Sequence, residues 1–212
     1  MPLPITSYAT LVAAVPEWAN RNDADYIAAV PLFIQQTELR MFRHLRCPGN
    51  EKTGVFAAMT FNNTVGVNIP QDYLEAKLLY YGSRPLERIS DQRMSEMTYE
   101  SPDVATPQYF ARINGALVFY PQADVNDDVR IIYYESQGPL SATVPLTRML
   151  EIAPFAYLYG ALAEGARYLR DPAETTLWDQ RFQSELESMN AQAYDNEAAG
   201  STVVVTQVGG GW

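Results

Sequence analysis

The residues of this chain that could do chemistry gather around its single histidine. His44 stands three positions before the only cysteine, Cys47. A nucleophilic site needs a histidine base beside its nucleophile, and a zinc site needs about four Cys, His or carboxylate ligands. A histidine near the predicted end of a helix is favoured by the helix dipole alone. The pair therefore predicts neither a protease-like site nor a metal site.

Glu38 is the carboxylate with the most unusual position. It lies in line with Ile34, Met41 and Leu45 on a predicted helix, so we expect a partly buried, structural side chain. A buried carboxylate usually has a partner, and an arginine is the expected one. A glycosidase would need a second carboxylate that faces the same cleft, and no other carboxylate is predicted near an apolar face.

Three arginines, Arg40, Arg43 and Arg46, recur toward the end of the same helix. Cations there complement the helix dipole and can form ion pairs with the acidic helix near the end of the chain. The alternative is a local contact with DNA phosphates. Because the net charge is −10, we expect no tight binding of duplex DNA.

No other motif of catalytic or cofactor-binding chemistry stands out. The chain has no P-loop, no glycine-rich dinucleotide-binding turn and no nucleophile elbow. Asp124, Asp127 and Asp128 share one loop, but their spacing lacks the glycine and glutamate of an EF-hand. We therefore predict no catalytic residue, no metal and no cofactor, and a structural protein rather than an enzyme.

The composition indicates a folded protein with adhesive surfaces. Of the 212 residues, 47% are hydrophobic and 19% are charged, which is enough for a genuine core. A single cysteine allows no intrachain disulfide. The N-terminus lacks signal-peptide features and no stretch approaches the length of a bilayer span, so we expect a soluble protein with no membrane partner. The 14 tyrosines are typical of half-apolar surfaces such as protein interfaces.

Helical periodicity predicts helices in the first and last thirds of the chain. Thr6 or Ser7 can cap a helix that runs to Trp18, and Pro16 should end or bend it. A second helix runs from Asp23 or Asp25 to about residue 46. Two more are expected over 152–169 and 172–193, the latter begun by Asp171 and Pro172.

The last two helices carry the clearest packing signals. In the first, the apolar face comprises positions 155, 158, 162, 166 and 169, and small residues fill much of the remaining surface. In the second, we expect Trp178 and Phe182 to be buried structural residues that pack on that face. Their apolar stripe continues through Leu186, Met189 and Ala193.

The middle of the chain predicts a meander of antiparallel strands, because its links are too short for crossover helices. Strands are expected over 55–61 and 65–69 as one hairpin, 78–81 and 86–89, 109–113 and 117–120 around Asn114-Gly115, and 129–134, with a short helix over 91–99. The predicted fold class is α+β. Terminal helices form a helical lobe from residues 1–50 and 147–198, with an antiparallel β lobe inserted over 51–146.

Residues 199–212 are predicted to form an extended C-terminal arm that docks on a partner. The stretch 201–208 is uncharged and β-prone, with no sequence neighbour to pair with. Adding a strand to a partner's sheet edge would satisfy its backbone groups. The docking residues are predicted to be Val203, Val204, Val205, Val208 and Trp212. The alternative is a loose terminus.

An ordered series of segments resembles the head-to-tail adaptor, or head-completion, proteins of short-tailed phages. The series covers residues 6 to about 190, and each segment alone is unspecific. It consists of Tyr8-Ala-Thr-Leu with Trp18-Ala-Asn-Arg, Ala29-Val-Pro-Leu-Phe with Leu45-Arg46, Ile69-Pro-Gln-Asp-Tyr-Leu, Thr106-Pro-Gln-Tyr-Phe with Asn114-Gly115 and Tyr120-Pro121, Ile132-Tyr-Tyr-Glu with Pro139-Leu-Ser, and Tyr157-Leu-Tyr-Gly-Ala-Leu with Asp171 and Trp178.

The resemblance implies a virion protein, made in the host cytoplasm and placed at the head–tail junction. Such adaptors form a ring, dodecameric in the family, that joins the portal protein to the tail nozzle and lines the DNA channel. The arm would then dock on the portal or on a neighbouring subunit. The alternatives are another tail-ring or gatekeeper subunit and a virion-associated cell-wall glycosidase, the latter needing paired carboxylates.

Overall fold

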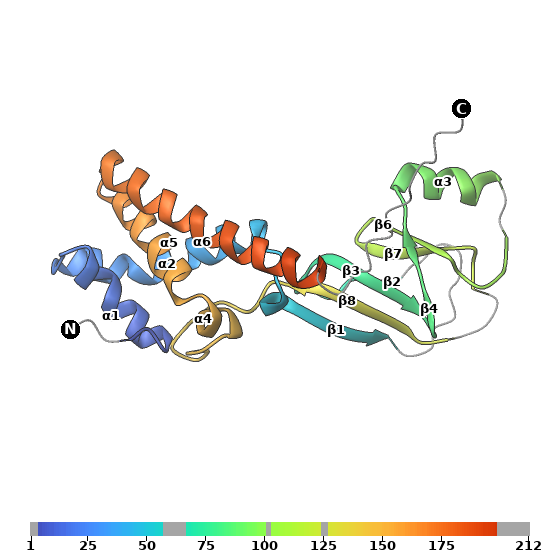
Figure 1. The fold of residues 1–212 in the computed structure, drawn as a ribbon, viewed down its shortest axis with the longest axis horizontal. Coiled ribbons are helices and arrows are strands. Elements are labelled where there is room, and N and C mark those ends of the chain that lie inside the picture. Colours follow the sequence, from blue (N-terminus) through green and yellow to red (C-terminus); the bar gives the residue numbers. More distant parts are fainter. Residues whose placement is uncertain (1–3, 57–66, 101–102, 124–126, 199–212) are drawn as a thin grey trace, which may run out of the picture. The chain divides into compact units, whose positions relative to one another are not determined.

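The computed structural model describes residues 4–56, 67–100, 103–123 and 127–198, and the chain divides into two compact units (Figure 1). A helical unit comprises the chain up to Gly49 and from Pro139 onward, and a β unit comprises Asn50–Gly138. The fold class is α+β, as predicted. The second boundary lies at 138/139 rather than at 146/147, because the backbone of segment 139–146 bonds to the helical unit: the Leu140 amide donates to Glu38.

The helical unit is built from five helices with clear local signals. Ser7 caps the first of them and accepts a hydrogen bond from the Thr10 amide at 3.3 Å. Asp171 caps the last, accepting from the amides of residues 173 and 174, with Pro172 in the first turn. The helices are α1 (Tyr8–Trp18), α2 (Ala24–His44), α4 (Arg148–Ile152), α5 (Pro154–Tyr168) and α6 (Pro172–Ala198).

Helix α5 lies at the centre of this unit and contacts α1, α2, α4 and α6. Ten of its residues are buried, and glycines allow neighbouring helices to approach closely. A Cβ placed on Gly160 would lie 2.2 Å from Thr37 Cγ2 on α2, and one on Gly165 would lie 2.3 Å from the Tyr26 hydroxyl oxygen. The predicted apolar face is buried only in its middle, because its end residues Phe155 and Leu169 are exposed.

Helix α6 covers another side of α5 with a shorter stripe than predicted. Phe182, Leu186 and Ala193 are buried, and the Phe182 ring lies beside Gly160. Trp178 is partly rather than fully buried. The Trp178 ring instead packs on the ring of Tyr159 near the surface, with centroids 5.9 Å apart.

The β unit contains two four-stranded sheets with strand orders β1-β8-β3-β4 and β2-β7-β6-β5. Most of the predicted hairpin of 55–61 with 65–69 lies outside the described residues, and within them β1 pairs with β8 and β2 pairs with β7. The pairing is antiparallel except between β5 and β6, which are parallel. The elements are β1 (Glu51–Phe56), β2 (Val67–Asn68), β3 (Tyr73–Tyr81), β4 (Arg84–Pro85), β5 (Glu87–Arg88), α3 (Asp91–Glu100), β6 (Tyr109–Ile113), β7 (Ala116–Tyr120) and β8 (Val129–Glu135), preceded by a 3-10 turn at Pro48–Asn50.

Two tight turns of the β unit follow the sequence signals. Asn114 and Gly115 join β6 to β7 with φ values of 50° and 76°, as a two-residue hairpin turn requires. Gly82 joins β3 to β4 with φ of 57°, and a Cβ there would also meet the Asp127 carboxylate. A hydrophobic cluster that includes residues of β3, β7 and β8 forms the core of the unit, with Leu79, Leu117 and Ile131 fully buried.

The contact between Gly160 and Thr37 gives a test of the helical packing. Gly160→Ala should lower the free energy of unfolding by about 1–3 kcal/mol, because the new methyl group forces α5 away from α2. This loss should appear even though alanine is the better helix former by about 1 kcal/mol. Denaturant unfolding would measure it. Adding Thr37→Ser removes the opposing methyl group and should restore part of the stability. An unchanged stability of Gly160→Ala would contradict the close approach.

Candidate functional site

Glu38 is a buried carboxylate without a cationic partner among the described residues. Its exposed fraction is 4%. It accepts hydrogen bonds from the Leu140 amide at 3.1 Å and from the Tyr157 hydroxyl at 3.4 Å. Burial raises the pKa of Glu38 to about 7, and these two hydrogen bonds oppose the rise. The expected arginine partner is therefore wrong, and the carboxylate instead fastens the returning segment at Leu140 to α2 and α5.

Arg40 belongs to a network of ion pairs that joins three helices. Its guanidinium donates to Glu164 of α5 at 2.6 Å and to Asp179 of α6 at 2.7 Å. Arg167 pairs with the same two carboxylates. These contacts keep the pKa of Arg40 above its usual range despite burial. Arg40 also lies over the Phe182 ring, 4.9 Å from its centroid, so it is committed to structure.

The other two arginines of the predicted cluster do not join Arg40. Arg43 is exposed on α2. Arg46 is half-buried and donates to the carbonyl oxygens of Phe42 and Leu45, at 3.1 Å and 2.8 Å. This contact with the end of α2 is the one that a cation at a helix C-terminus is expected to make. The three arginines therefore do not converge on one phosphate-binding surface.

The remaining chemical candidates supply no site in the described part of the chain. Cys47 is buried, and the carbonyl oxygen of His44 accepts a hydrogen bond from the side chain of Asn190 at 3.0 Å. Over the described residues, no cluster of His, Cys, Asp or Glu could hold a metal ion. Asp124 and the arm residues Val203, Val204, Val205, Val208 and Trp212 lie outside the described residues.

A cluster of aromatic rings forms the first candidate interface, at the surface where α1, α5 and α6 meet. We call Trp18, Phe155, Tyr159 and Trp178 the aromatic face. Phe155 stacks on Tyr159 with centroids 5.9 Å apart, and Trp18 lies edge-on to Trp178 at 6.4 Å. The Arg181 guanidinium lies over the Trp178 ring at 4.8 Å. Phe155 remains 48% exposed, so this face offers apolar contact area to another molecule.

The second candidate interface is the outer side of α2. Its exposed apolar residues are Ile27, Leu32 and Leu39, the last with 58% of its surface exposed. The other exposed residues between Ile27 and Leu39 are alanine, proline and glutamine, so this α2 face carries no charge. The charged residues Asp25 and Arg43, both exposed, mark its two ends. An uncharged, exposed helix face in a chain of net charge −10 indicates a contact surface.

The two faces lie on different sides of the helical unit. The buried residues of α2, among them Phe33, Ile34 and Thr37, face inward, and Thr37 contacts α5. The α2 face therefore points away from α5, whereas the aromatic face includes residues of α5 itself. We did not predict these surfaces from the sequence. The available signal was that α2 carries apolar residues on two sides, of which only one can pack against α5.

The fold and these surfaces define a structural, protein-binding class of protein. The family model described as SU10 adaptor protein matches residues 6–206, and the chain belongs to this family. It is thus a phage adaptor protein, a structural component that interacts with other phage structural proteins. A comparison with curated proteins finds no match. None of the described helices combines the length and apolar character needed to cross a membrane.

The raised pKa of Glu38 predicts a pH-dependent stability. Its folded-state pKa of about 7 exceeds the ordinary value of 4.5, so its stabilising contribution is complete below pH 4.5 and is lost as the pH rises through 7. The loss should reach at most about 3 kcal/mol, since one pKa unit corresponds to 1.36 kcal/mol. Denaturant unfolding between pH 5 and 8 would measure it.

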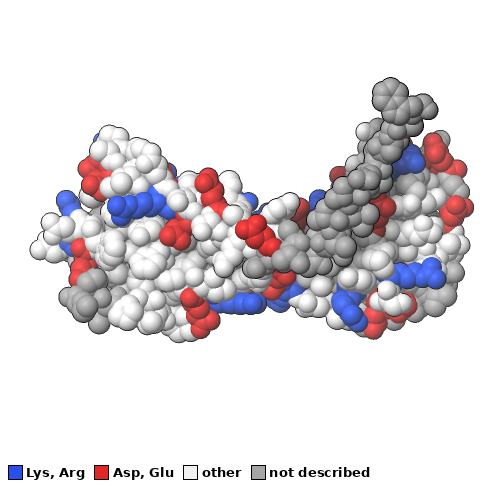
Figure 2. Space-filling view, viewed as in Figure 1, with Lys and Arg blue, Asp and Glu red and all other residues white. Residues whose placement is uncertain are grey.

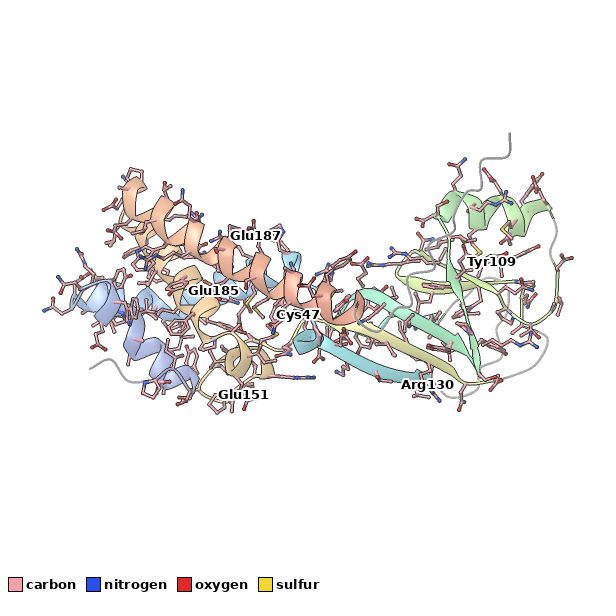
Figure 3. All side chains as sticks on the ribbon, viewed as in Figure 1. Cys47, Tyr109, Arg130, Glu151, Glu185 and Glu187 are labelled. Atoms are coloured by element: carbon pink, nitrogen blue, oxygen red, sulfur yellow. The ribbon has the colours of Figure 1, made fainter. Side chains whose placement is uncertain are left out.

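Glu38→Gln should flatten that pH dependence, because the amide does not ionise. Glu187, an exposed carboxylate on α6 (Figure 3), provides the matched control as Glu187→Gln. The control should keep the wild-type profile. If Glu38→Gln also kept it, the buried carboxylate would not be the titrating group.

Proposed function

We propose that this adaptor forms a ring of identical copies at the head–tail junction of the virion. There it would join the portal protein to the tail nozzle and surround the passing DNA. The observation that carries the proposal is the pair of unlike faces on different sides of the helical unit. A closed ring uses heterologous contacts, in which one surface of each copy meets a different surface of the next.

The size of the α2 face bears on how the ring would assemble. From Ile27 to Leu39 the helix rises about 18 Å, and with a width of about 10 Å the face covers on the order of 200 Å². Stable interfaces bury about 800 Å² per partner. The faces alone would therefore give a monomer or weak oligomer in solution. The portal would supply the missing contacts, and the family's dodecamer would form on it.

The surface charge fits a channel wall that does not hold DNA. On the side shown in Figure 2, basic side chains are scattered among acidic ones and form no continuous track. The net charge of −10 adds a repulsive mean field. Arg40 is engaged by Glu164 and Asp179, which removes one member of the only arginine cluster that we considered for phosphate binding.

Substitutions on the two faces test the ring. Leu32→Glu with Leu39→Glu should disable the α2 face, and Phe155→Glu should disable the aromatic face. Each variant alone should fail to form rings on the portal, by native mass spectrometry, because buried unpaired charge opposes the contact. A mixture of the two variants should form pairs that stop at dimers, since one intact contact remains.

Tyr99→Glu, a change at a 91% exposed side chain of the β unit, is the matched control and should assemble normally. Normal rings from both face variants would overturn the proposed interface. Rings that form on tail components but never on the portal would instead favour another tail-ring or gatekeeper subunit.

The free adaptor should bind no duplex DNA at physiological salt. Fluorescence anisotropy with a labelled duplex would measure the binding across salt concentrations. Sub-micromolar binding that weakens steeply with salt would contradict the proposal and would return Arg43 and Arg46 to consideration as phosphate contacts.

A further inference from the structure

The β unit has a long strand edge, that of β1, that no described strand covers. Three of its four edge strands, β2, β4 and β5, are two residues long. The fourth, β1, runs over six residues from Glu51 to Phe56 and pairs on one side only, with β8. An edge of this length presents a row of backbone donors and acceptors that can pair with another chain.

The charged residues of β1 do not protect this edge from pairing with another strand. Glu51 receives an ion pair from Lys77 at 2.7 Å. Lys52 is held by Asp72 at 2.5 Å and by Glu135 at 3.1 Å. Natural edge strands are commonly protected by free charges, lysine above all. Here both charges are occupied within the unit, and the rest of β1, Thr53 to Phe56, is uncharged.

The outer side of this sheet is also partly apolar along the β1 edge. Val55 is 61% exposed and lies opposite Arg130 of β8, which is labelled in Figure 3. Thr53 lies opposite Ile132, and Leu78 of β3 continues that row and is exposed. A strand added beside β1 would place β-branched side chains next to Thr53 and Val55, and such cross-strand pairs stabilise sheets.

We propose that residues 201–208 of a second copy add to β1 as an outer strand. The assignment rests on the proposed ring, which puts copies side by side. The stretch Ser201-Thr-Val-Val-Val-Thr-Gln-Val208 is uncharged, β-prone and long enough to cover six residues. Only Ala199 and Gly200 separate α6 from this stretch, so the added strand would begin within about 10 Å of Ala198, and the proposal requires the β1 edge of the second copy to lie beside the end of α6. This gives the arm a sheet edge as its partner in place of the portal.

Cysteine pairs test the proposal directly. One batch carries Val55→Cys, and each other batch carries a single cysteine at one arm position from 202 to 208. Two batches are mixed, assembled on the portal and mildly oxidised, so any link must join two different copies. Side chains of a strand alternate between faces. A disulfide needs Cα atoms within about 7 Å. We therefore expect disulfide-linked dimers chiefly at one arm position, the residue paired with position 55, and little linking at the positions directly before and after it. The natural Cys47 is buried, and wild-type protein should give no link.

The outcomes separate this proposal from the ring itself. Rings without any linked position, or equal linking at all arm positions, would overturn strand addition and leave the ring standing. A further variant carries both cysteines in one chain. If links formed only in that variant, the arm would pair with β1 of its own subunit, and the proposed contact between copies would be wrong. Deleting 199–212 should weaken the ring between copies. If the deletion variant still formed rings and lost only its binding to the portal, the portal would be the partner of the arm.

A second measurement uses the arm alone. Val204→Pro with Val205→Pro removes adjacent amide donors, so whichever of them pairs with β1 is lost. The linked dimers should fall at least tenfold. The matched pair Val204→Thr with Val205→Thr keeps strand propensity and should link normally. Equal linking by both double variants would contradict a hydrogen-bonded strand.

Discussion

The close approach of α2 to α5 is the constraint on which the helical unit depends. Gly160 admits Thr37, and Gly165 admits the Tyr26 hydroxyl, so two helices meet at distances that a single methyl group would forbid. This approach brings Glu38 against Tyr157 and Arg40 against Glu164. The same packing turns the opposite side of α2 to solvent. The contact surface and the interior of the unit therefore have one origin, the small residues of α5.

The helical unit handles its two buried acids in different ways. Glu164 is neutralised by Arg40 and Arg167, and the resulting network ties α2, α5 and α6 together at their exposed rims. Glu38 has no such counter-charge among the described residues and accepts hydrogen bonds from neutral donors. Burial favours its protonated form, although both donors favour the ionised one. The first acid therefore fixes helix positions through ion pairs, while the second makes the attachment of segment 139–146 sensitive to pH.

Local signals in the sequence predicted elements well and predicted partners poorly. The caps at Ser7 and Asp171 and the Asn114-Gly115 turn act through neighbouring residues, so short-range chemistry was sufficient to place them. The pairing of β1 with β8 joins residues that are far apart in the chain, and no local pattern encodes that choice. The prediction of an arginine partner for Glu38 was wrong for the same reason, because the actual partner, Leu140, lies more than 100 positions away in the chain. The burial of Trp178 depends on its contact with Trp18 at the end of α1. The periodicity of α6 alone carries no information about that neighbour.

The chain enters and leaves the β unit through neighbouring strands. Glu51, the first residue of β1, lies opposite Tyr134 near the end of β8. The inserted unit therefore has its two attachment points side by side, as in domains that can be inserted into other proteins. An evolving phage could exchange this cassette without rebuilding the helical framework, and an engineer could replace it with a short loop. The surface of the inserted unit is in this way free to diverge independently of the helical unit that carries it.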